Sequence, residues 1–143
     1  MTETPNEEKG PEKDADDHPT PGQNPEPGRK PFDLEDRTYE FAQAVRSLVR
    51  RLPVTLCNKE DAAQLVRASG STGANYIEAN EGLSRKDFIH RIKICRKEAK
   101  ESAYWLRLVY TGSRADLDRE RNLLVNEARE LVRIFNKIVK SSE

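Results

Sequence analysis

The chain has 143 residues, a length that suits one domain, and it carries 25 acidic and 25 basic residues. It contains no apolar run as long as a membrane span, and Cys57 and Cys95 fit neither a disulfide framework nor a zinc-site spacing. These features argue against an integral membrane protein and a disulfide-rich secreted one. We expect two reduced thiols, a cytoplasmic location and no membrane contact.

Residues 1–33 differ in composition from the rest of the chain. They contain seven of the eight prolines, and nine acidic against four basic residues give them a net charge of −5. A segment with so few apolar residues cannot bury enough surface to offset the entropy cost of folding. We therefore predict a disordered, acidic, proline-rich tail over residues 1–33. Residues 34–143 hold 21 basic and 16 acidic residues, a net charge of +5, and form the predicted domain.

Apolar residues recur at helical spacing through residues 34–143, and no alternating strand pattern interrupts them. The first helix ends at Pro53. The second begins at Asn58, which we predict as its N-cap because Asp61 follows three residues later, and it ends before Gly82.

The third helix begins at Ser84, a predicted N-cap, and ends at the turn that contains Gly112. The fourth runs from Leu117 to Ile138. The predicted core stripe of the third helix consists of Phe88, Ile92, Cys95, Ala99, Ala103, Leu106 and Val109. Four amphipathic helices with short connections predict an all-α, antiparallel up-down four-helix bundle over residues 34–143.

The second helix contains mostly small residues, and no charge lies between Ala68 and Ala74. On a helical wheel Gly73 and Ile77 share a face that we expect to meet the core, but the opposite face is also small. We therefore predict that another copy of the chain covers that opposite face; the alternative is a tightly packed monomer. The predicted interface between copies consists of Ala68, Ser71, Ala74, Asn75, Glu78, Tyr104, Trp105 and Leu108.

Basic residues form a stripe along the third helix, within about 120° of arc on the wheel, and the fourth helix adds further cations. Aligned like charges repel one another, but they attract phosphate chains. We predict nucleic-acid binding by this stripe; the alternative interpretation is a solvated face. The predicted binding residues are Arg85, Lys86, Lys93, Arg96, Lys97, Lys100, Arg107, Arg129, Arg133 and Lys137.

Catalytic chemistry has little basis in this sequence. His90 has no clear Ser or Cys partner, and Glu98 with Glu101 is not followed by the Glu-x-x-His motif of di-iron bundles. No glycine-rich phosphate loop, zinc spacing or nucleophile elbow is present. We therefore predict a non-enzymatic protein with no catalytic residue, metal or cofactor.

The run SGSTGANYIEANEGLSRKDFIHRIKICRKEAKESAYWLRLV resembles the family of 23S rRNA-intervening-sequence proteins. The resemblance covers residues 32–139 and excludes the tail. It implies an antiparallel four-helix bundle that assembles as a homopentameric ring with a basic surface. A related branch comprises accessory proteins of diversity-generating retroelements, which bind nucleic acid and a reverse transcriptase. The family has no catalytic residues to carry over, and Asn75, Glu78, Ser84 and Phe88, which match its motif, are interpreted as structural.

These observations lead to one main functional hypothesis and two alternatives. The main hypothesis is a cytoplasmic homo-oligomer that binds nucleic acid, with RNA expected, through phosphate contacts of low sequence specificity. The first alternative is a scaffold that docks a protein partner, such as a reverse transcriptase, on its basic face. The second is a small-molecule or metal-binding bundle enzyme, for which the sequence offers no ligand set.

Overall fold

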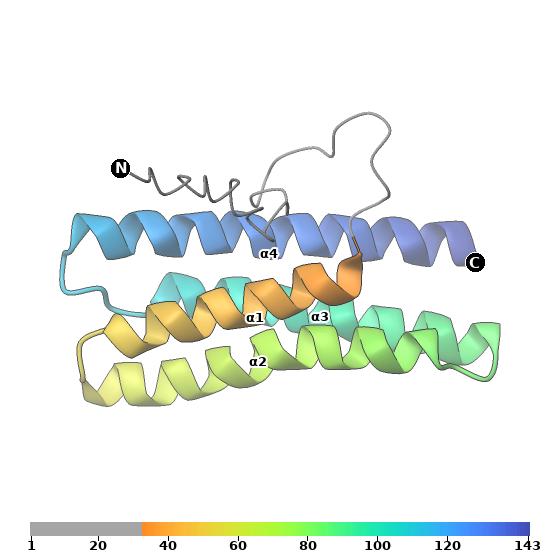
Figure 1. Cartoon of the computed structure of the whole chain (residues 1–143), viewed down its shortest axis with the longest axis horizontal. Coiled ribbons are helices and arrows are strands. Elements are labelled where there is room, and N and C mark those ends of the chain that lie inside the picture. The colour runs from red at the N-terminus through yellow and green to blue at the C-terminus, as the bar shows by residue number, and fades with distance from the viewer. Residues whose placement is uncertain (1–32) are drawn as a thin grey trace, which may run out of the picture.

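The computed structural model describes residues 33–143, which form four helices in an antiparallel up-down bundle (Figure 1). In chain order the helices are α1 (Leu34–Arg51), α2 (Leu56–Asn80), α3 (Arg85–Leu108) and α4 (Ala115–Ser142). The α1–α2 and α3–α4 connections lie at one end of the bundle, and the α2–α3 connection lies at the other end, next to the C-terminus. The predicted four-helix bundle is confirmed. The predicted disorder of residues 1–32 lies outside the described residues.

Short polar side chains begin α1 and α3. Oδ1 of Asp33 accepts a hydrogen bond from the backbone N–H of Glu35 at 2.9 Å, and Oγ of Ser84 accepts one from the N–H of Asp87 at 3.1 Å. Such bonds satisfy backbone donors that the first helical turn leaves unpaired. Ser84 is therefore the cap that the sequence predicts, and Asp33 belongs to the domain and not to the tail.

The start of α2 differs from the prediction. Thr55 is the N-cap, and its Oγ1 accepts the N–H of Asn58 at 3.0 Å. The buried Asn58 amide instead joins two connections: its Nδ2 donates to the carbonyls of Pro53 (2.9 Å) and Tyr110 (2.8 Å), and its Oδ1 accepts the N–H of Tyr110 (2.8 Å). One side chain therefore ties the α1–α2 connection to the α3–α4 connection.

The core of the bundle contains apolar residues of all four helices. On α3 the predicted stripe is confirmed, except that Phe88 is only partly buried. Burial raises the pKa of the Cys95 thiol to about 12, so that the thiol stays protonated at neutral pH. Cys57, in contrast, is exposed at the start of α2.

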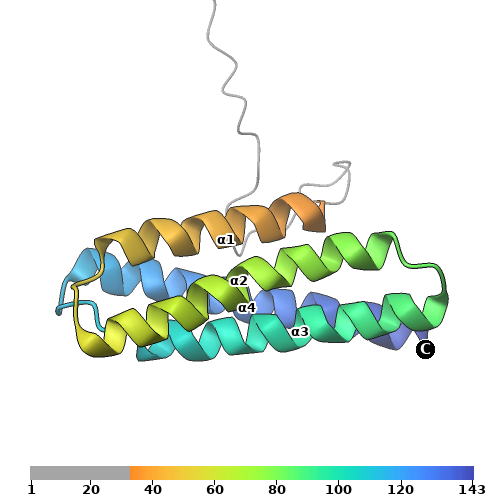
Figure 2. The same ribbon diagram turned by 90° about the horizontal axis from the view of Figure 1, so that it is seen from below.

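α2 is rotated about its own axis relative to the prediction. Both of its flanks are covered by helices of the same chain. α2 packs against α1 on one side and α3 on the other (Figure 2). Leu65, Ala68 and Thr72 are fully buried, whereas Ile77, which we placed in the core, is 42% exposed. Ala68 has no surface left for another chain, so its assignment to the interface between copies is wrong. Because α2 has small residues on every side, a helical wheel could not show which side is buried.

Gly73 permits a close contact between α2 and α1. A Cβ added at Gly73 would lie 2.7 Å from Oγ1 of Thr38, whose buried hydroxyl donates to the carbonyl of Leu34 at 2.7 Å. A Cβ at Gly70 would meet only the guanidinium end of Arg46, at 3.1 Å. Gly73, and not Gly70, is therefore required by a helix contact inside one chain.

Candidate nucleic-acid interface

Three of the predicted basic residues on α3 contact α4. Nη1 of Arg96 donates to Oδ1 of Asn136 on α4 at 3.0 Å, and Nζ of Lys93 lies 3.7 Å from the Glu143 carboxylate. Arg85 hydrogen-bonds to the last turn of α4. These contacts direct one flank of α3 towards α4, and we call the cations along both helices the basic row.

Most members of the basic row have no acidic partner. Arg133 pairs with Glu130 on the same helix, and Lys93 pairs with Glu143. Seven others are exposed and form no ion pair with any residue of the described range 33–143: Lys86, Lys97, Lys100, Arg107, Arg129, Lys137 and Lys140. Unpaired like charges in one area raise the local potential and attract a polyanion.

The length of the basic row suits an extended ligand. Lys86 and Arg107 are separated by about 32 Å along α3 at 1.5 Å per residue. That distance equals about nine steps of a DNA strand at 3.4 Å per step. A linear anion could therefore contact several of these cations at once.

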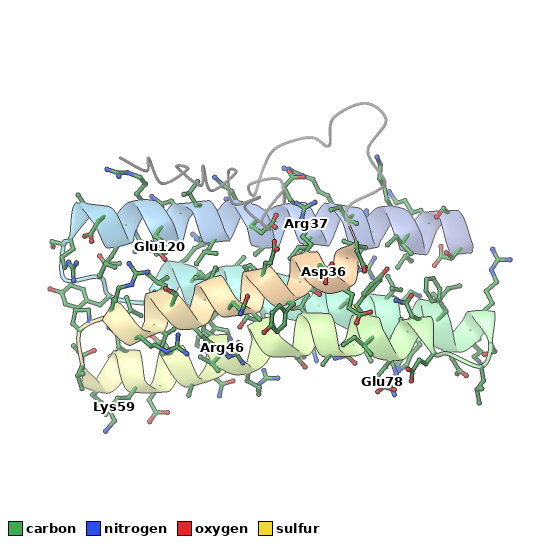
Figure 3. All side chains as sticks on the ribbon, viewed as in Figure 1. Asp36, Arg37, Arg46, Lys59, Glu78 and Glu120 are labelled. Atoms are coloured by element: carbon green, nitrogen blue, oxygen red, sulfur yellow. The ribbon has the colours of Figure 1, made fainter. Side chains whose placement is uncertain are left out.

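Cations on the α1–α4 side of the bundle are paired. Arg37 on α1 donates from Nε and Nη2 to the two carboxylate oxygens of Glu127 on α4, at 3.0 and 2.6 Å, and Glu127 is only 4% exposed. The bond to Glu127 raises the pKa of Arg37. Arg51 binds Glu120 at 2.5 Å, and Glu120 lies between α4 and α1, as Arg37 does (Figure 3). Both arginines therefore bind acidic side chains of the same chain, Arg37 with a buried partner and Arg51 at the surface.

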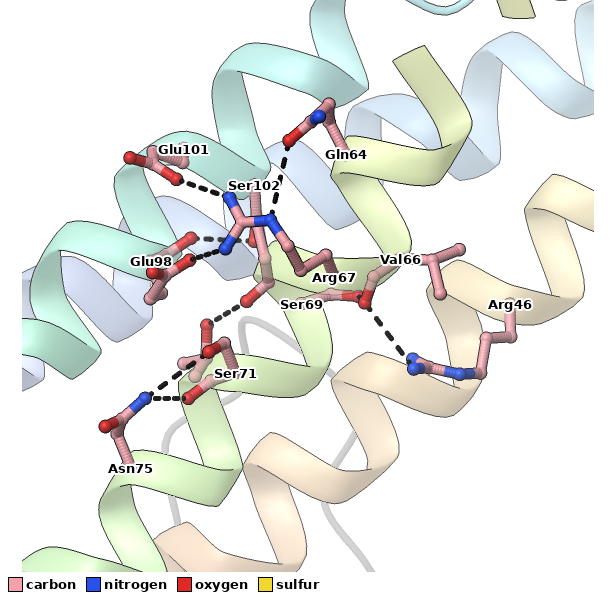
Figure 4. Close-up of polar contacts among 12 residues, drawn as sticks. Arg46, Gln64, Val66, Arg67, Ser69, Ser71, Asn75, Glu98, Glu101 and Ser102 are labelled. Carbon is pink, nitrogen blue, oxygen red and sulfur yellow. Dashed lines mark hydrogen bonds and ion pairs between the residues drawn. The ribbon is translucent and has the colours of Figure 1, made fainter. Parts of the chain in front are cut away.

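A polar cluster between α2 and α3 was not predicted. Arg67 on α2 donates to Glu101 at 3.2 Å and to Gln64 at 3.4 Å, and its Nη1 lies 3.6 Å from Oε2 of Glu98 (Figure 4). Glu98 is 6% exposed, and its Oε2 has no hydrogen-bond partner among the described residues. Glu98 lies three residues after Cys95 and therefore on the same face of α3. This spacing was the sequence signal for the burial of Glu98.

A hollow of about 450 Å³ lies beside this cluster. It is lined by Gln64, Arg67, Lys100, Glu101, Tyr104 and Trp105. The rings of Tyr104 and Trp105 meet edge to face, with their centroids 5.1 Å apart. Because Lys100 also belongs to the basic row, the hollow opens next to that row.

The structure places the predicted interface residues in two separate areas. Ser71, Ala74, Asn75 and Glu78 lie along the C-terminal half of α2, with Asn75 accepting a hydrogen bond from Arg91 of α3 at 3.2 Å. Tyr104, Trp105 and Leu108 lie on the C-terminal half of α3, which in an antiparallel pair runs beside the N-terminal half of α2.

A second hollow, of about 740 Å³, runs between α1 and α2. Gly70, Gly73 and Ala74 line it, together with Tyr39 and Ile77, which are 63% and 42% exposed.

Within residues 33–143, no cluster of three or more acidic, His or Cys side chains could hold a metal ion. No helix of this part of the chain has the length and apolar character needed to cross a membrane.

Comparison with known proteins identifies relatives of the four-helix domain. Residues 31–137 match the family model of the 23S rRNA-intervening sequence protein. The structure is similar to the crystal structure of a Bacteroides thetaiotaomicron protein of unknown function from the S23 ribosomal protein family. The two are 29% identical with a TM-score of 0.62, over 76% of this chain and 99% of that one. No curated protein matches the sequence.

Proposed function

The chain belongs to the family of 23S rRNA-intervening sequence proteins, and on that premise we propose that it is a non-enzymatic, cytoplasmic protein that binds nucleic acid through its basic row. The seven unpaired cations on α3 and α4 support this proposal more than any other observation. Arg37 and Arg51, in contrast, bind carboxylates of the same chain. Exposed cations without partners suit a ligand that brings its own negative charge.

The contacts of the basic row go to phosphates. Lysine and arginine on a convex helical surface can neutralise a phosphate chain, which fixes the position of the protein without reading the sequence of the bases. Each such contact releases a bound counterion, so binding weakens steeply as salt rises. By this relation, each phosphate contact to duplex DNA makes binding about eightfold tighter at 0.1 M salt than at 1 M salt.

The protein is proposed to act as a homo-oligomer of five copies, on the resemblance described above. Its contact surface is the outer strip of α2 with Ser71, Ala74, Asn75 and Glu78, together with the end of the α1–α2 hollow that Tyr39 and Ile77 border. Exposed Tyr39 and Ile77 at the border of that hollow support the choice, because adjoining exposed apolar side chains often mark interfaces. Assembly would repeat the basic row and strengthen its field.

The alternative is a protein partner with an acidic surface, such as a polymerase or reverse transcriptase. The same unpaired cations would satisfy acidic side chains of a protein as well as phosphates. The two proposals differ in what the purified protein binds on its own, because a protein scaffold has no affinity for unrelated RNA or DNA.

A matched pair of charge-reversal variants tests the proposal. The first carries Lys97→Glu and Arg107→Glu in the basic row, and the control carries Lys59→Glu and Arg50→Glu; all four cations are exposed and lack an ion pair with described residues. Fluorescence anisotropy with labelled RNA and DNA at 0.1 M salt measures the affinity. We expect the first variant to lose at least about tenfold in affinity and the control to stay within about threefold.

Three outcomes decide between the proposals. A selective loss in the first variant supports nucleic-acid binding by the basic row. Equal losses in both variants contradict it, because any cation would then serve. Failure of the unaltered protein to bind RNA or DNA also contradicts it and favours the scaffold.

A further inference from the structure

The hollow beside Tyr104 adds a second kind of contact to the basic row. We propose that Tyr104 and this hollow hold an unpaired nucleobase, so that the protein binds single-stranded nucleic acid in preference to a duplex. This inference rests on the proposed function and specifies its ligand. It assigns Tyr104 and Trp105 to the nucleic acid and not to contact between copies.

Tyr104 lies inside the basic row. On α3 it is one turn from Lys100 and one turn from Arg107, and with Lys97 these residues fall within about 60° of Tyr104 on the helical wheel. None of the three cations forms an ion pair with a described residue. An exposed aromatic ring between unpaired cations is the combination by which proteins bind single strands, with bases on the ring and phosphates on the cations.

The Tyr104 ring is both available and supported. Its residue is 54% exposed, and its ring meets Trp105 at an interplanar angle of 77°. Trp105 is partly buried and packs against the core, so it supports the tyrosine from one side. A base in a duplex is stacked on both faces, so only an unpaired base can use this ring.

The hollow suits an uncharged ring better than a phosphate. The hollow of about 450 Å³ is open to solvent, and its lining is mostly apolar. The charge of Arg67 at its wall is already neutralised by Glu101 and Glu98, and these carboxylates would repel a phosphate. The Nε2 amide group of Gln64 donates to no described residue, so it can meet the hydrogen-bonding edge of a base.

Trp105 provides a direct signal because it is the single tryptophan of the chain. The full-length protein is titrated with a labelled single-stranded oligonucleotide and with the duplex of the same sequence. We expect the single strand to quench tryptophan fluorescence and the duplex to leave it unchanged.

Substitutions of Tyr104 test the stacking contact itself. Tyr104→Ala should weaken single-strand binding by about 5- to 150-fold, the ratio that corresponds to one stacked base, and change duplex binding by less than about twofold. Tyr104→Phe keeps the ring and should stay within about twofold of the unaltered protein. The control is Tyr110→Ala, an equally exposed tyrosine that lines neither hollow, which should have no effect.

The outcomes separate this inference from the function on which it rests. If Tyr104→Ala is silent, or weakens single strand and duplex equally, while Lys97→Glu with Arg107→Glu abolishes binding, the inference is wrong and the proposed function stands. If the unaltered protein binds neither form, both are wrong. A loss confined to single strands, rescued by Tyr104→Phe, supports both.

Discussion

α4 borders two surfaces that use their charges in opposite ways. Towards α1 it presents Glu120 and Glu127, which bind Arg51 and Arg37. Towards α3 and the outside it presents cations such as Arg129, which have no acidic partner among the described residues. One helix therefore carries charges that hold the fold together on one flank and charges available to a ligand on the other. Along α4, the presence of a carboxylate–arginine pair separates the flank that holds the fold from the flank that we propose binds a ligand.

The largest effect should follow from breaking the paired side. Arg37→Ala leaves Glu127 as a buried carboxylate without its two hydrogen bonds, and loss of one partner of such a pair costs about 3 kcal/mol or more. Urea unfolding monitored by circular dichroism measures this loss. As the control, Lys97→Ala on the unpaired side should change stability by less than about 0.5 kcal/mol. Similar losses in both variants would show that the two surfaces do not differ in this way.

A smaller effect should distinguish two glycines on the α1 side. Gly73→Ala places a methyl group 2.7 Å from Thr38 Oγ1, and such overpacking costs about 1 to 3 kcal/mol. Gly73→Leu should cost more because its larger side chain must enter the same contact. Gly70→Ala meets only the mobile end of Arg46 and should be neutral or stabilising by up to about 1 kcal/mol, because alanine favours helix.

Thermal unfolding of the two alanine variants provides the comparison. A higher midpoint for Gly70→Ala than for Gly73→Ala is expected. The reverse order would mean that the α1–α2 contact does not set the glycine requirement.

The smallest effect concerns the acidic residues at the N-terminus. Residues 1–33 carry a net charge of −5, and because they are covalently joined to the domain we predict that they compete with nucleic acid for the basic row. Deletion of residues 1–31 should therefore tighten nucleic-acid binding about threefold at low salt, with a gain that shrinks as salt screens the charges. The thermal midpoint should barely change. Equal affinities of both proteins at low salt would show that the acids do not compete.

The fold and the basic row could be predicted because both depend on strong local patterns. On α3, the cations and the buried apolar residues occupy separate arcs, so spacing alone separated the basic row from the core. On α2, small residues face every direction, and only the neighbouring helices show that Leu65 and Thr72 are buried while Ile77 is not. Local sequence could not fix that rotation.

Pairing of charges could not be predicted from the sequence. Arg37 and Glu127 are 90 positions apart, so their bond depends on the way α1 packs against α4. Glu98 and Arg67 likewise meet only when α2 packs against α3. Which cations remain without partners is therefore a property of the folded bundle, and the proposed binding surface depends on it.

The salt dependence of binding tests the central claim most directly. The association constant for a labelled single strand is measured at several salt concentrations for the unaltered protein, the variant with Lys97→Glu and Arg107→Glu, and the control with Lys59→Glu and Arg50→Glu. For a single strand, each neutralised phosphate contributes about −0.7 to the slope of log association constant against log salt concentration. Four or more contacts therefore give a slope of about −3 or steeper. We expect the first variant to lose about 1.4 of that slope and the control to lose none. Equal slopes for all three proteins would contradict binding by the unpaired cations of α3 and α4.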